Sequence, residues 1–110
     1  MKAIAMKMKK LSEHSNSAAA LLSAMANPKR LLILCNLVNG EIPVGVLANQ
    51  VGLSQSALSQ HLSKLRAQKL VRTRRDAQTI YYSSNAPQVM TLLSALESIY
   101  GEAEQSKTAA

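Results

Sequence analysis

The stretch "GLSQSALSQHLSKLR" (residues 52–66) places leucines at helical spacing among serines and glutamines, and it contains no acidic residue. Gly52 stands where a preceding helix should end, and Ser54 is a good N-cap for a helix that we expect to reach about Ala67. At about 100° per residue, Leu58, Leu62 and Leu65 gather on one side and the small polar side chains on the other. The stretch therefore predicts a helix with one buried face and one uncharged polar face.

The residues before this helix predict three more helices. Residues 13–27 are rich in alanine and form the first. Pro28 suits the first turn of a second helix, which should end near Gly40. A brief third helix, "VGVLANQV" (residues 44–51), leads into Gly52. Two short helices joined by a tight glycine-containing turn form a helix-turn-helix pattern.

The residues after it predict a hairpin and a last helix. "LVRTRR" (70–75) and "TIYYSS" (79–84) are rich in residues that favour strands, with a short turn between them. Residues 87–100 begin with a proline and form the last helix. The expected order is α-α-α-α-β-β-α, which is mainly α with a β-hairpin wing, a winged helix-turn-helix.

The length of 110 residues fits one compact domain. We expect this domain to span residues 13–100. Residues 1–12 should form a flexible basic N-terminus and residues 101–110 a flexible tail, because neither segment shows periodicity.

The positive charge is concentrated in the middle of the chain. Thirteen Lys and Arg against six Asp and Glu give a formal charge of +7. An acid-free interval between Glu41 and Asp76 holds Lys64, Arg66, Lys69, Arg72, Arg74 and Arg75. Such an excess favours an anionic partner, nucleic acid or an acidic membrane surface, and its concentration favours nucleic acid over a merely basic protein.

The polar face of the fourth helix is suited to reading DNA bases. The major groove is about 12 Å wide and admits one helix, in which Gln can bond adenine and Ser can bond base edges or phosphates. The alternative, a solvated face, normally mixes Lys with Glu. We expect contacts from Ser54, Gln55, Ser56, Ser59, Gln60, Ser63 and Lys64. His61 lies between the two faces. We expect it to pack against neighbouring residues or to flank the polar face, where it could touch a phosphate, and not to bind a metal.

The hairpin carries a second group of candidate DNA contacts, which are Arg72, Arg74, Arg75 and Gln78. Arginine on a projecting loop can bind phosphates or enter a narrow minor groove. The alternative is an edge strand protected from aggregation by its charges. Lys29 and Arg30 either add phosphate contacts or are exposed to solvent.

The first and last helices carry more apolar surface than one small core needs. These residues are Leu21, Leu22, Met25, Val89, Leu92, Leu93, Leu96, Ile99 and Tyr100. We assign all of these residues except Val89 to the interface of a homodimer. Such a dimer would place two recognition helices about 34 Å apart on a roughly palindromic site. The alternative is that both helices complete the core of the monomer.

Other function classes find little support. There is no Gly-rich phosphate loop and no evident nucleophile with a base, so an enzyme is not expected. No cofactor is expected. No apolar run approaches the ~20 residues that a membrane span needs. Cys35 is the single cysteine, so no disulfide forms within one chain, which suits a cytoplasmic protein.

Three segments, "LLSAMANPKRLLIL", "VGLSQSALSQHLSKLR" and "LVRTRRDAQTIYY", resemble the ArsR/SmtB family of winged-helix repressors. The resemblance covers roughly residues 20–100. Within the family the chain is most similar to the repressors of rhizobial nodulation, and next to the thiol-switched, reactive-sulfur-sensing branch and a virulence activator of vibrios. It implies a homodimer that binds double-stranded operator DNA, with the first and last helices forming the interface.

The resemblance also implies sensing sites that this chain lacks. Family metal sites use a Cys-x-Cys pair before the helix-turn-helix or Asp and His on the last helix, and neither pattern is present, so we expect no metal. Thiol-switched relatives pair two cysteines. Cys35 matches the first, but Gly101 stands at the second. We expect Cys35 to pack as a small hydrophobe. The alternatives are a redox- or sulfur-responsive repressor that uses Cys35, and a winged-helix protein-interaction module.

Overall fold

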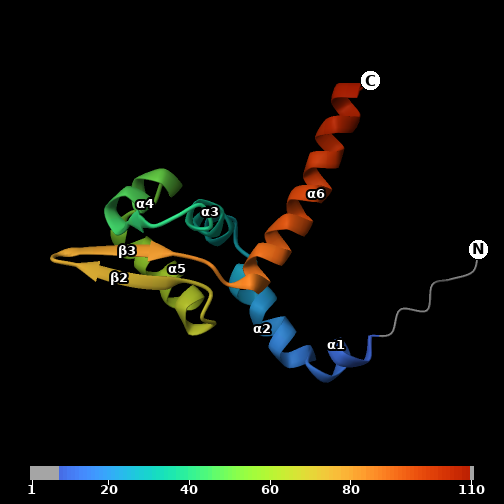
Figure 1. Ribbon diagram of the computed structural model, residues 1–110, viewed down its shortest axis with the longest axis horizontal. Helices are drawn as coiled ribbons and strands as arrows, with labels where there is room; N and C mark the ends of the chain where they lie inside the picture. The colour runs from blue at the N-terminus through green and yellow to red at the C-terminus, as the bar shows by residue number, and fades with distance from the viewer. Residues whose placement is uncertain (1–7, 110) are drawn as a thin grey trace, which may run out of the picture.

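The computed structural model describes the backbone of residues 8–109 and the side chains of residues 8–101. Its elements are α1 (Lys9–Glu13), α2 (Ser15–Met25), α3 (Pro28–Leu37), β1 (Ile42–Pro43), α4 (Val44–Val51), α5 (Gln55–Ala67), β2 (Arg72–Asp76), β3 (Thr79–Ser83) and α6 (Pro87–Ala109) (Figure 1). The fold is mainly helical with a hairpin wing, so the predicted fold class is confirmed.

Three features differ from the expected elements. β1 pairs antiparallel with β3, giving a three-stranded sheet of order β1-β3-β2. A two-residue strand is too short to show alternation, so the sequence pattern did not reveal it. α1 includes residues 9–12 of the N-terminal segment expected to be flexible, and residues 1–7 of that segment fall outside the described residues. α6 continues past Tyr100 because Gly101 keeps an ordinary helical φ and does not end the helix.

Side-chain caps fix the starts of α3 and α5. The side chain of Asn27 accepts hydrogen bonds from the backbone N–H of Lys29 (2.8 Å) and of Arg30 (3.1 Å) at the start of α3. Ser54 caps α5 as expected, because its Oγ accepts from the N–H of Ala57 at 3.2 Å. These caps satisfy donors that the first helical turn leaves without partners.

The hydrophobic core lies where α3, α4, α5 and the sheet meet. Its most deeply buried side chains are Ile33, Leu34, Leu37, Leu47, Leu58, Leu62, Leu65, Leu70 and Val89. The three leucines of α5 are therefore the buried side of that helix. Ser84 is buried among these residues, where its hydroxyl donates to the carbonyl of Leu70 at 2.7 Å.

Figure 1 shows α3, α4, α5 and the sheet as one lobe. The helices α1, α2 and the long α6 lie on the side of this lobe away from the tip of the hairpin. The far end of α6 projects away from the lobe, with no other described element beside it in this view. No single described helix is long and apolar enough to cross a membrane; only α2 and α3 together, bent by 89°, pass that test of length and composition.

Candidate nucleic-acid interface

The polar face of α5 is fully presented to solvent. Ser56, Ser59, Gln60 and Ser63, which we call the polar stripe, are all exposed. On the opposite side of the helix Leu58, Leu62 and Leu65 are buried in the core. The stripe is therefore a rigid row of hydroxyl and amide groups, because its helix is anchored along the whole of its other face.

The first turn of α5 combines capping with further polar groups. The Oγ of Ser54 lies 3.4 Å from the Oγ of Ser56 while it also caps the helix, so its geometry is fixed by the protein. Gln55 is exposed beside it. The N-terminal end of α5 thus presents hydroxyl and amide side chains together with the positive end of the helix dipole, which favours a phosphate.

Two cations flank the polar stripe. At about 100° per residue, Lys64 and Arg66 lie about 80° to either side of the direction of Ser56. Both are exposed. Because the two phosphate backbones form the two walls of a major groove, a helix with its stripe on the base edges would bring these cations toward opposite strands. The contact set proposed from the sequence includes Lys64 but misses Arg66, which the same helical spacing could have found.

The hairpin divides its cations between two faces. Cross-strand pairs place Arg72 opposite Ser83 and Arg74 opposite Tyr81, whereas Arg75 pairs with Ile80 on the alternate face. Arg72, Arg75 and Gln78 are exposed and make no hydrogen bond or ion pair with another described side chain. These three groups are free to meet DNA.

Arg74 differs from these three groups because it is already engaged. Its Nε lies 2.8 Å and its Nη2 2.9 Å from the two carboxylate oxygens of Glu41, and its guanidinium lies 4.5 Å from the centre of the Tyr81 ring. This arrangement lowers the pKa of Glu41, chiefly through the hydrogen bond from Arg74. No pattern in the sequence predicts this pairing, since Glu41 and Arg74 are distant along the chain.

Lys29 and Arg30 support the helices instead of standing free in solvent. The Nζ of Lys29 donates to the carbonyl of Val51 at the end of α4 (2.6 Å). The Nε of Arg30 donates to the carbonyl of Ala24 at the end of α2 (2.6 Å). Both side chains are half-buried, so they are not simply exposed to solvent, and a phosphate contact from either stays a prediction.

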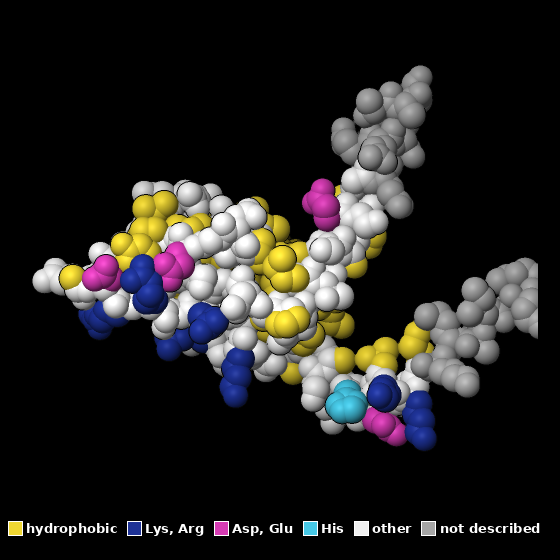
Figure 2. Space-filling model, in the orientation of Figure 1, with side chains coloured by type: hydrophobic (Ala, Val, Ile, Leu, Met, Phe, Trp, Pro, Cys, Tyr) yellow, Lys and Arg dark blue, Asp and Glu magenta, His cyan; other side chains and the backbone are white. Residues whose placement is uncertain are grey.

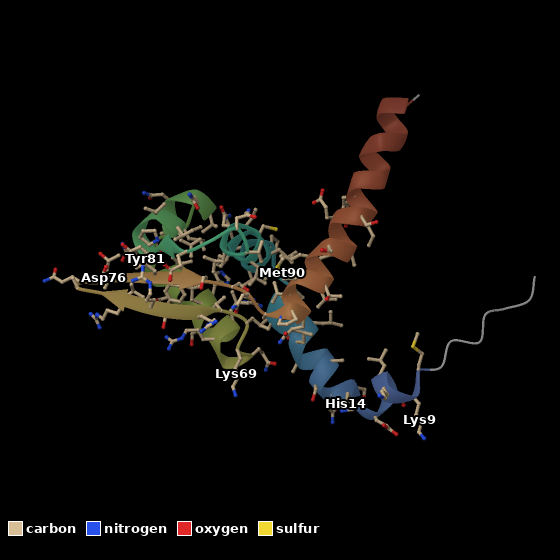
Figure 3. The ribbon with its side chains drawn as sticks, in the orientation of Figure 1. Lys9, His14, Lys69, Asp76, Tyr81 and Met90 are labelled. Carbon is tan, nitrogen blue, oxygen red and sulfur yellow. The ribbon has the colours of Figure 1, made fainter. Side chains whose placement is uncertain are left out.

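The distribution of charge separates two sides of the lobe. Figure 2 shows Lys and Arg side chains along the lower edge of the lobe, whereas on the hairpin above this edge two acidic side chains lie on either side of one further cation. In Figure 3, Lys69 lies below α5 and the hairpin, and Asp76 and Tyr81 lie on the hairpin toward α4. The cationic edge is the side on which an anionic polymer would approach.

The residues predicted to form a dimer interface fall into three groups. Leu22 (54% exposed), Leu96 (36%), Ile99 (58%) and Tyr100 (71%) are uncovered, whereas Leu21, Leu92 and Leu93 are half-buried against the core. Met25 is only 4% exposed and belongs to the monomer core. Between α2, α3 and α6 lies a cavity of about 250 Å³, lined almost entirely by apolar groups that include Leu22 and Leu96.

The expectation that Cys35 packs in the core is wrong. Ile33, Leu34 and Leu37 fill the inward face of α3, and Cys35 lies on another side of the helix, where it is exposed. It lines a hollow of about 530 Å³ between α3 and α6, together with Met90 and Glu97. Within the described part of the chain, no three His, Cys, Asp or Glu side chains lie together as metal ligands.

A helix-turn-helix followed by a hairpin wing, with an exposed polar recognition helix beside a cationic edge, defines a winged-helix DNA-binding protein. The model for the bacterial regulatory proteins of the arsR family matches residues 27–73, which include α3, α4 and α5. The nodulation protein NolR of Rhizobium meliloti is 69% identical over 90 residues, covering 82% of this chain and 74% of NolR. The chain belongs to the arsR family, and it is a DNA-binding transcriptional regulator, not an enzyme.

Other relatives agree in sequence and in fold. The transcriptional activator HlyU of Vibrio cholerae is 43% identical over 105 residues, covering 96% of this chain and 97% of HlyU. The crystal structure of NolR from Sinorhizobium fredii superposes with a TM-score of 0.79 at 66% identity, covering 90% of this chain and 98% of that one. A homodimeric winged helix-turn-helix DNA-binding domain from Mycobacterium bovis superposes with a TM-score of 0.75 at 26% identity, covering 94% and 95%.

Proposed function

We propose that this regulator is a homodimer that represses transcription by binding a roughly palindromic operator, reading its bases in two successive major grooves. The observation that carries the proposal is the polar stripe of α5, exposed and free of acid while the leucines opposite are buried. The proposed base contacts are Gln55, Ser56, Ser59 and Gln60. The proposed phosphate contacts are Ser54, Ser63, Lys64, Arg72, Arg75 and Gln78, with Arg66 added from the structure.

The uncovered apolar surface of α2 and α6 supports the homodimer. Leu22, Leu96 and Ile99 form one apolar surface beside the cavity between α2, α3 and α6. Apolar side chains in such a patch gain about 25 cal/mol for each Å² removed from water, which favours association. The homodimeric Mycobacterium bovis domain, which shares the fold, also supports it. Two copies related by a two-fold axis would set two α5 helices about one DNA turn apart.

DNA binding in this proposal requires no metal ion and no cofactor, since the described carboxylates, imidazoles and thiol do not converge. The proposed place of action is the cytoplasm, where a bacterial regulator meets its DNA. The relative NolR is named a nodulation protein, which supports a role in the control of nodulation genes for this chain.

The experiment begins with selection of binding duplexes from a random library by the purified full-length protein. The affinity of the selected duplex is then compared with that of a scrambled duplex of the same composition, with added zinc and with a chelator. We expect tighter binding to the selected duplex by at least a hundredfold, unchanged by zinc or chelator. Equal binding to both duplexes would refute sequence-specific recognition, and loss of binding in chelator would refute metal independence.

A further inference from the structure

The outer face of the sheet carries a three-residue cluster that the proposed DNA interface does not use. Arg74 reaches from β2 across the ring of Tyr81 on β3 to the carboxylate of Glu41, immediately before β1. Its side chain therefore spans the three strands in the order β2, β3, β1. Because α4 begins directly after β1, this contact ties the hairpin to the start of the helix-turn-helix.

The geometry is that of a strong arginine–carboxylate pair. Two guanidinium nitrogens meet two carboxylate oxygens at 2.8–3.1 Å, which is bidentate and fixes the orientation of both groups. The aromatic face beneath the guanidinium adds a cation–π contact at 4.5 Å. The two carboxylate oxygens of Glu41 and the ring of Tyr81 together hold the Arg74 side chain in one place, although both charged groups remain partly exposed.

The charge of the cluster is unsuited to a phosphate. Asp76 Oδ2 lies 4.0 Å from Nη1 of Arg74, so two carboxylates surround one guanidinium, and their formal charges sum to −1. A phosphate approaching the guanidinium of Arg74 would meet these two carboxylates. Arg72, on the same face of the hairpin, and Arg75, on the other face, have no acidic partner among the described side chains.

We propose that Glu41, Arg74 and Tyr81 form a strap that sets the position of the wing relative to the recognition helix, and that Glu41 is a specificity-determining residue because it holds Arg74 away from DNA. This proposal rests on the proposed function. The strap holds the hairpin in one position relative to α5. In that position, only a duplex of the right shape contacts α5 and the hairpin at the same time. Without Glu41, the guanidinium is released as one more phosphate contact that ignores sequence.

The test measures how the affinity for scrambled duplex depends on salt, because each phosphate contact adds about 0.9 to the slope of log affinity against log salt concentration. Arg74→Gln is made in three backgrounds: wild type, Glu41→Gln and Asp76→Asn. We expect no change of slope in the wild-type background, and a slope smaller by about one in the Glu41→Gln background, where Arg74 is free. The Asp76→Asn background removes an equal charge but leaves the bidentate pair, so the slope should again not change.

A second readout is the ratio of the affinities for selected and scrambled duplexes. We expect Glu41→Gln and Arg74→Gln each to lower this ratio at least fivefold, while Asp76→Asn leaves it within twofold. Urea denaturation of each variant shows whether it is folded, as expected for exposed residues.

Three results would overturn the strap. Arg74→Gln that lowers the slope equally with and without Glu41 would make Arg74 an ordinary phosphate contact. Arg74→Gln that lowers it in neither background would show that the freed side chain does not reach DNA. If Arg74→Gln lowered the slope in the Asp76→Asn background as it does in the Glu41→Gln background, the change of slope would be explained by net charge alone. The slopes are measured on scrambled DNA, so they test the strap even if the wild-type protein shows no sequence preference, which would refute the proposed function instead.

Discussion

Gly52 and Lys69 occupy equivalent positions, one after each helix of the helix-turn-helix, and both have a left-handed backbone, with φ of 70° and 60°. After α4 the N–H of Leu53 donates to the carbonyl of Ala48 at 2.9 Å, and after α5 the N–H of Leu70 donates to that of Leu65 at 3.0 Å. Both ends are therefore Schellman motifs, but only the first carries the glycine that this conformation favours.

The first prediction follows from this difference. Lys69→Gly should raise the free energy of unfolding by about 1 kcal/mol, because a side chain with a Cβ is strained in the left-handed region. Gly52→Ala should lower the free energy of unfolding by about as much. Urea unfolding followed by circular dichroism measures both. Lys69→Ala is the control, since it removes the same charge and keeps the Cβ. If Lys69→Ala raised the free energy of unfolding as much as Lys69→Gly, the loss of charge would explain the effect.

The second prediction concerns base readout. Gln60→Ala should weaken binding to the selected duplex by about 1–3 kcal/mol and leave binding to scrambled duplex unchanged, because a lost base contact is felt only where the base is present. Fluorescence anisotropy with both duplexes measures the two affinities. Gln88→Ala, an exposed glutamine on α6, is the matched control and should alter neither. Equal losses on the two duplexes would show that Gln60 does not read bases.

The local features of the candidate interface could be predicted from the sequence because they depend on spacing alone. The N-cap of α5 follows from the residue type of Ser54, and the burial of Leu58 and the exposure of Ser56 follow from helical periodicity. The dimer contacts and the base contacts remain predictions, since they depend on molecules beyond one chain.

What the sequence did not reveal depends on which distant segments meet. Cys35 stands in a leucine-rich stretch, but its side of α3 faces the hollow between α3 and α6, where it stays exposed. Lys29 and Arg30 look like free surface cations, yet the ends of α4 and α2 supply carbonyl partners. Arg74 looks like its neighbours on β2, and only the pairing of β1 with β3 brings Glu41 within its reach.

The third prediction tests the homodimer. Leu96→Asp should shift the full-length protein from dimer to monomer and lower the affinity for the selected duplex at least tenfold, because a buried, unpaired carboxylate is costly in an apolar interface. Sedimentation velocity and anisotropy on the same samples measure both. Thr91→Asp introduces the same charge on the opposite side of α6 by helical spacing and should leave the dimer intact. A monomeric Leu96→Asp protein with full affinity would separate dimerisation from DNA binding.

The fourth prediction concerns His61, whose Nδ1 accepts a hydrogen bond from Nη1 of Arg30 at 3.2 Å. Burial, with the charges of Arg30 and Lys64, lowers the pKa of His61 below its ordinary value of 6.5. Below pH 6.5 the unfolded chain therefore binds a proton that the folded chain resists, so stability should fall as the pH drops from 6.5 toward the folded-state pKa, and should not depend on this group above 6.5.

Urea unfolding at several values between pH 5 and pH 8 measures this dependence. His61→Asn should flatten the curve below pH 6.5, since the titrating group is gone. Gln88→Ala is the control, because it removes an exposed side chain that does not titrate, and it should leave the curve as it is in the wild-type protein. A His61→Asn protein that still loses the same stability between pH 6.5 and pH 5 would assign the dependence to other groups and refute the destabilising role of His61 protonation.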